Sequence, residues 1–227
     1  MIDQPVKEAL ELPFLRANVD PLWDAFRTAY NTALENTTRD HARDDQVTGR
    51  AVQLLAPLLV SREPPPTSPR VRQDQPGVQR TQAYLNGRGR GLADKLLAAF
   101  ATEPRGLPGC LERAQRCGGF DWFRDRLEHH GFTRAIAWRL CLAFRRAGLL
   151  NSAPNRPYLD RRSLEVAQRL LAGTGVRAQS VRDWEAALML EGDSRFAAGA
   201  HSAKLDAEIV VAACARLAAT KVDSIKR

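Results

Sequence analysis

The chain has few cysteines and histidines, and none of them is spaced like a set of metal ligands. It holds four of each in 227 residues, with no CxxC pair and no His/Cys cluster, whereas structural zinc sites use closely spaced pairs. Cys110 and Cys117 are not followed by the close ligands that an iron–sulfur loop needs. We therefore expect reduced thiols, no metal and no cofactor.

The sequence also lacks a long apolar run. No stretch approaches the ~20 apolar residues that a membrane-spanning helix needs. The first residues, Met-Ile-Asp-Gln-Pro-Val-Lys-Glu, do not follow the basic-then-apolar pattern of a signal peptide. These absences predict a cytoplasmic protein with no membrane partner.

Positive charge, by contrast, is abundant. The formal net charge is +8, and 44% of the residues are hydrophobic, so the chain can bury a substantial core. Most of the positive side chains are arginines, which bind phosphate through two parallel hydrogen bonds. This balance favours a polyanionic partner, and double-stranded DNA is the one we expect.

Apolar residues recur at helical spacing along most of the chain, and strand patterns are almost absent. The sequence predicts an all-α fold: an N-terminal helical segment (1–61), a proline-rich linker or loop (62–77) and a larger helical body (78–227). In the N-terminal segment, Asp20 and Pro21 fit the cap and first position of a helix that runs to Leu34. The helices expected in the body are 78–85, 92–102, 107–117, 120–129, 133–147, 161–172, 180–191 and 203–220.

Alternating glycine and arginine separate the first two helices expected in the body. The segment Asn86-Gly-Arg-Gly-Arg-Gly is no phosphate-binding P-loop, since no Lys-Ser/Thr follows and no strand precedes it. The pattern is typical of an exposed basic turn, which either touches a DNA backbone or is simply solvated.

The most informative stretch runs from Asp121 to Leu140 and reads as helix, tight glycine turn and second helix. On the second helix, at 100° per residue, the arginines gather on the side opposite the apolar residues, with Trp138 among them. Such a face suits phosphate contact and stacking on a base. The alternative is a solvated basic face with Trp138 packed against a neighbouring helix.

One interpretation of this region is a winged helix-turn-helix. Residues 120–150 form the helix-turn-helix, and the Gly-Leu-Leu step at residues 148–150 leads into a wing. The wing needs two extended strands, and Pro154-Asn-Arg-Pro157 is a poor hairpin tip. This interpretation predicts a DNA-binding regulator without catalytic activity.

A third possibility is a helical protein-interaction module. In such a protein the basic face is exposed to solvent and binds no DNA.

The other interpretation rests on a resemblance. The pattern Gly131-Phe-Thr-Arg-Ala, followed 29 residues after the glycine by the acid of Tyr158-Leu-Asp-Arg-Arg, resembles the helix-hairpin-helix DNA glycosylases, in their 8-oxoguanine-glycosylase-like branch. The resemblance covers roughly residues 78–191. It implies that the hairpin amides bind a phosphate and that Asp160, which opens the next helix, is the catalytic carboxylate. Asp160 also fits the N-cap of that helix.

The chain departs from that family at two places. The hairpin has His129-His130-Gly131 where the family has Gly-x-Gly, and Thr133 stands where bifunctional members carry the Schiff-base lysine. Without that amine, no imine with the sugar forms by this route, so the resemblance implies a monofunctional enzyme. Asp160 then orients or deprotonates a water and stabilises the charge that develops on the deoxyribose.

The resemblance and the positions of the residues give the following site for a monomeric enzyme. The expected DNA contacts are Gly131, Thr133, Arg134, Arg161 and His130, and the expected base pocket consists of Trp122, Phe132 and Trp138. The enzyme flips out one nucleotide and hydrolyses its N-glycosidic bond to leave an abasic site. The departures favour a modified base, such as a hypermodified pyrimidine in viral DNA, alongside a damaged one, and with it a role in antiviral defence.

Overall fold

The structure is a computed structural model that describes residues 15–40, 46–60, 76–197 and 205–224. Within these ranges every regular element is an α-helix, which confirms the all-α prediction. None of the described helices has the length and apolar character to cross a membrane. The chain divides into two compact units: Met1–His41 with Pro154–Arg227, and Ala42–Ala153.

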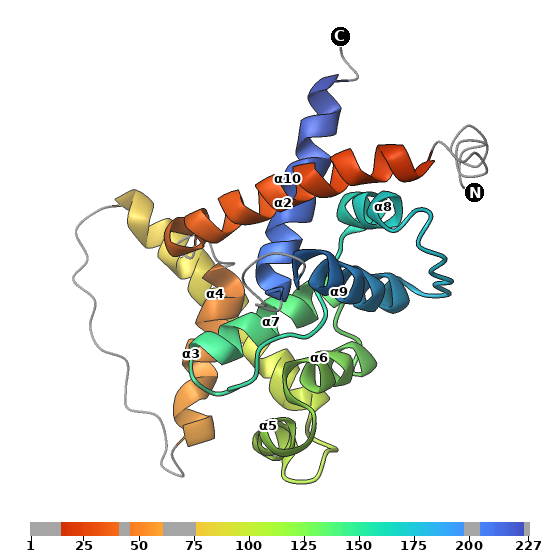
Figure 1. Ribbon diagram of the computed structural model, residues 1–227. Helices are drawn as coiled ribbons and strands as arrows, with labels where there is room; N and C mark the ends of the chain where they lie inside the picture. Colours follow the sequence, from red (N-terminus) through yellow and green to blue (C-terminus); the bar gives the residue numbers. More distant parts are fainter. Residues whose placement is uncertain (1–14, 41–45, 61–75, 198–204, 225–227) are drawn as a thin grey trace. The chain divides into compact units, whose positions relative to one another are not determined.

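The first unit combines the N-terminal helix with the C-terminal part of the chain. Its helices are α2 (Leu15–Asp40), α8 (Arg161–Leu170), α9 (Val181–Ala197) and α10 (Ala207–Ser224). Figure 1 shows α2, in red, lying across the blue α10, and these two helices are in contact.

Aromatic side chains of α2 form the centre of this unit. Trp23, Phe26 and Tyr30 are buried because they recur every three or four residues on one side of the helix. The Phe26 ring lies 6.2 Å from the ring of Phe196 in α9. The indole N–H of Trp23 donates to the carbonyl of Leu170 at the end of α8 (2.9 Å). These contacts hold α2 against helices that lie more than 140 residues away in the sequence.

The second unit is continuous in sequence. It contains α3 (Gln46–Val60), α4 (Pro76–Ala99), α5 (Gly106–Cys117), α6 (Gly119–His129) and α7 (Arg134–Arg146). Its core is also aromatic: Phe123 stacks on Phe100 at 5.9 Å and meets Phe144 edge-on at 5.4 Å. The contacts of Phe123 thus join α6 to the end of α7 and to Phe100, the residue that follows α4.

The alternating Gly-Arg segment is helical, so the turn predicted at residues 86–91 is wrong. Helix α4 runs through all three glycines without a break. Gly89 is buried against α3, and a Cβ added there would lie 2.8 Å from Cγ of Arg50. The Nε–H of Arg50 donates to the side chain of Asn86 (2.9 Å). Close packing on α3 therefore outweighs the low helix propensity of glycine.

The N-terminal helix begins earlier than the sequence predicted. Because α2 starts at Leu15, Pro21 lies inside the helix rather than at its first position. Most of the predicted linker (62–77) lies outside the described residues, and α4 begins at Pro76.

Candidate nucleic-acid interface

The turn between α6 and α7 is a tight helix-to-helix connection built on Gly131. Gly131 has a φ of +81°, a left-handed conformation that favours glycine. The N–H of Phe132 donates to the carbonyl of Leu127 (3.1 Å), and the N–H of Gly131 donates to that of Glu128 (3.0 Å). These two hydrogen bonds form a Schellman motif at the end of α6, and the side chains of Phe132 and Leu127 are both buried.

Thr133 begins the second helix of the turn. Its backbone is extended (φ −64°, ψ 152°), and its hydroxyl oxygen accepts a hydrogen bond from the N–H of Ile136 (3.4 Å). Gly131 and Thr133 are both exposed. The backbone N–H groups of the first turn of a helix point outwards along its axis and attract anions. The turn therefore presents the N-terminus of α7 at the surface of the second unit.

Two cationic side chains border this turn. Arg134 is the first residue of α7 and is partly exposed. Lys95 comes from α4, and its ammonium group lies 4.8 Å from the centre of the Phe132 ring. No local sequence pattern marks Lys95, because it lies 36 residues before the turn and only the packing of α4 brings it there. Lys95 of α4 and Arg134 of α7 thus place positive charge beside the N-terminus of α7.

His130, a predicted DNA contact, is held inside a small polar cluster. Its Nε2 atom lies 3.0 Å from the carboxylate of Glu103, to which Arg126 also donates a hydrogen bond. Its ring packs on Phe100 at 4.5 Å. Burial opposes the charge on Glu103, but the hydrogen bonds from His130 and Arg126 hold the pKa of its carboxyl below the usual value. This cluster fixes the end of α6.

The three aromatic residues expected to form a base pocket differ in exposure. Trp122 is half-buried, whereas Phe132 and Trp138 are only 3% and 5% exposed. Trp138 meets the ring of Phe120 edge-on at 5.1 Å and covers the guanidinium of the buried Arg124 (5.7 Å). Trp138 therefore packs against a neighbouring helix. This is the second of the two possibilities that the sequence left open for the arginine-rich face of α7, the first being a face that stacks on a base.

Asp160 and Arg161 belong to the first unit. Asp160 is exposed and caps α8: its Oδ1 atom accepts a hydrogen bond from the N–H of Ser163 (2.8 Å). This confirms the N-cap expected from the sequence. Arg161 is almost fully exposed, and its Nε atom lies 3.6 Å from Glu165 one turn later, a pair that adds little stability at the surface.

Two buried groups interact with Asp160 or with the residue before it. The N–H of Leu159 donates to the carboxylate of Glu185 in α9 (3.0 Å), and Glu185 is completely buried. Burial, together with the charge of Asp160, raises the pKa of Cys214 to about 12, so this thiol stays protonated near neutral pH. Glu185 could not be predicted from the sequence, because no local pattern marks a carboxylate that bonds to a backbone N–H 26 residues away.

The structure thus brings the predicted site residues together in two groups. Gly131, Thr133, Arg134 and His130 gather at the α6–α7 turn of the second unit. Asp160 and Arg161 lie side by side at the start of α8 in the first unit. Residues 147–160 form no strand, so the wing that a winged helix-turn-helix requires is not present there.

Comparison of the chain with protein-family models, with curated proteins and with solved structures gives no significant match.

Proposed function

We propose that this chain is a DNA glycosylase of the helix-hairpin-helix type that hydrolyses the N-glycosidic bond of a modified or damaged base. The observation that carries the proposal is the exposed Gly131–Thr133 turn, which sets the N-terminus of α7 beside Lys95 and Arg134. Amides and cations in this arrangement suit a DNA phosphate, which positions the duplex without reading its sequence.

Asp160 supplies the chemistry. The cap of α8 uses its Oδ1 atom, and the side chain is exposed to solvent. The carboxylate orients a water and accepts its proton as the water oxygen forms a bond with C1′ of the flipped nucleotide. The N-glycosidic bond breaks, its electron pair leaves with the base, and the base takes up a proton. The products are a free base and an abasic site.

Glu185 holds the backbone that presents this carboxylate. Its hydrogen bond with Leu159 anchors the residue before Asp160 to α9, and the Ser163 amide fixes the carboxylate itself. Two anchors of this kind limit the positions that the reactive oxygen can take, which is what a general base needs.

Substitution of Asp160 separates chemistry from folding. Asparagine caps helices about as well as aspartate, so Asp160→Asn keeps α8 but removes the base. We expect base release under single turnover to fall by roughly 10²–10⁴-fold with no loss of DNA affinity. Asp206→Asn is the matched control, because Asp206 is an exposed residue whose Oδ1 accepts from the N–H of Glu208 at the start of α10 (2.8 Å). Base release that survives Asp160→Asn contradicts the proposal.

A second candidate is a DNA-binding protein without catalytic activity. The burial of Phe132 and Trp138 favours it, because a flipped base stacks on exposed aromatic faces. This candidate predicts DNA binding that depends on Lys95 and Arg134 and is indifferent to Asp160. Measuring affinity and base release on the same variants separates the two functions.

A further inference from the structure

The second unit contains a cleft that the proposed glycosylase chemistry does not use. It lies between the N-terminal half of α3 and the part of α7 that begins at Arg139, and it encloses about 350 Å³. This volume is at the lower end of the range of small-molecule sites, roughly 300–1,000 Å³. The cleft is separate from the Gly131–Thr133 turn, which lies at the other end of α7.

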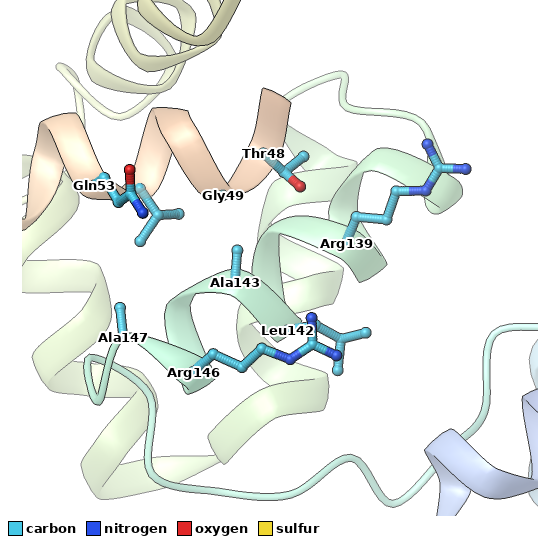
Figure 2. Close-up of a pocket in the computed structure, with 9 residues that line it drawn as sticks. Thr48, Gly49, Gln53, Arg139, Leu142, Ala143, Arg146 and Ala147 are labelled. Atoms are coloured by element: carbon cyan, nitrogen blue, oxygen red, sulfur yellow. The ribbon is translucent and has the colours of Figure 1, made fainter. Parts of the chain in front are cut away.

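Small residues open the space between the two helices. Ala143 on α7 and Ala147, which follows the end of that helix, line the cleft, and Gly49 lines it from α3. A Cβ added at Gly49 would have no neighbour within 4 Å. Figure 2 shows the Ala143 methyl group and the Thr48 side chain both directed into the gap between the helices. The hollow therefore exists because neither helix places a large side chain there.

The lining combines an apolar surface with positive charge. Val52 and Leu142 provide the apolar part, and Thr48 and Gln53 add a hydroxyl and a carboxamide. Among the described residues that line the cleft, two are arginines and none is acidic. Arg139 and Arg146, both exposed, are seven residues apart on α7, or about 10 Å along the helix axis.

The arginines border the cleft at its two ends. In Figure 2, Arg146 extends back along α7 toward Leu142, whereas Arg139 points outward from the opposite end. A ligand that suits this lining has a flat apolar part of limited size and an anionic group next to it. Guanidinium groups bind phosphate through two parallel hydrogen bonds, and aromatic bases pack on aliphatic side chains while bonding to amides and hydroxyls.

We propose that this cleft binds one nucleotide unit, with its base against Val52, Leu142 and Ala143 and its phosphate at Arg146 or Arg139. The nucleotide comes either from a free mononucleotide or from a single strand of DNA, since both present the same base and phosphate. This site adds to the proposed glycosylase activity and does not depend on it, because the cleft is lined by no residue of the Gly131–Thr133 turn and by none of the first unit's described residues.

The test uses isothermal titration of the full chain with three probes: dAMP, the single strand (dT)10 and inorganic phosphate. Binding of dAMP assigns the site to free nucleotides, and binding of (dT)10 that exceeds that of dAMP assigns it to a DNA strand. Either result supports the proposal when Gly49→Leu abolishes the binding, because (dT)10 can also bind at the Gly131–Thr133 turn. Phosphate that binds as tightly as the better of the other two probes overturns it, because the apolar surface then contributes nothing. Absence of binding by all three also overturns it.

Two kinds of variant locate the site. The double change Arg139→Gln and Arg146→Gln should weaken binding of the better probe at least tenfold, whereas Arg113→Gln with Arg116→Gln on α5 should leave it unchanged. Gly49→Leu places a side chain in the open space and should also abolish binding. Because Leu favours helix more than Gly does, this variant should fold, and circular dichroism checks it. Unchanged binding by Gly49→Leu overturns the assignment to the cleft.

Discussion

Alanine substitution at the three glycines of α4 should not change the free energy of unfolding in the same direction: it should rise at Gly87 and Gly91 and fall at Gly89. Gly87 and Gly91 have no atom within 4 Å of an added Cβ, whereas at Gly89 the added atom would lie 2.8 Å and 2.9 Å from Cγ and Cβ of Arg50. The Cβ atom of Arg50 is fixed by the backbone, so it cannot move away without shifting α3. One substitution therefore tests the packing of α3 on α4 at three adjacent sites.

The expected magnitudes follow from helix propensity and packing. Gly87→Ala and Gly91→Ala should each raise the free energy of unfolding by up to about 1 kcal/mol, because alanine favours helix over glycine by that amount. Gly89→Ala gains the same propensity but displaces Arg50, whose Nε–H donates to Asn86. Overpacking costs about 1–3 kcal/mol, so the net change at Gly89 should be destabilising.

Urea denaturation followed by circular dichroism measures all three variants against the wild type. Midpoints that rise for Gly87→Ala and Gly91→Ala and fall for Gly89→Ala agree with the structure. If this segment is instead an exposed turn, the three substitutions should have similar and small effects. Equal changes at Gly87 and Gly89 therefore refute the reasoning.

Three further predictions concern the α6–α7 region. Glu103→Gln should lower the free energy of unfolding by about 1–3 kcal/mol at pH 7. Because the folded-state pKa of Glu103 lies below its ordinary value of 4.5, this destabilisation should shrink as the pH falls through that lowered pKa. Equal destabilisation at pH 7 and pH 3 would contradict this. Lys95→Gln should weaken duplex DNA binding equally for all sequences and lower the log–log salt slope by about 1, measured by fluorescence anisotropy, and an unchanged slope would remove Lys95 from the interface. Gly119→Ala should lower the free energy of unfolding, measured by urea denaturation, by about 1–3 kcal/mol. The reason is that φ of Gly119 is +62° and the added Cβ would lie 2.5 Å from Oγ of Ser152. An unchanged free energy of unfolding would contradict this packing.

The sequence predicted the helices around the turn well because local signals mark their ends. Gly131 stops α6, Thr133 caps α7 and Asp160 caps α8, as their residue types indicate. Each signal acts within a few residues, so it needs no knowledge of the rest of the chain. The all-α class follows from the same periodicity.

Local signals failed where distant packing decides the outcome. The glycines of α4 predicted a turn, but contact with Arg50 stabilises a helix there. Trp138 falls among arginines on a helical projection, yet it is buried because α6 packs along that side and brings Phe120 and Arg124 against the indole ring. The polar bonds of Glu103 with His130 and of Glu185 with Leu159 join residues 26 or 27 positions apart. No pattern in a short window contains this information.

The most direct test of the central proposal is abasic-site formation on a panel of genomic DNAs, some natural, some oxidised and some from phages with modified bases. Wild type, Asp160→Asn and Asp206→Asn are compared at equal concentration, and the released bases are identified by mass spectrometry. We predict abasic sites on at least one DNA with the wild type and Asp206→Asn, and their loss with Asp160→Asn. Tight DNA binding with no base release from any DNA would contradict the proposal and favour the non-catalytic DNA-binding protein.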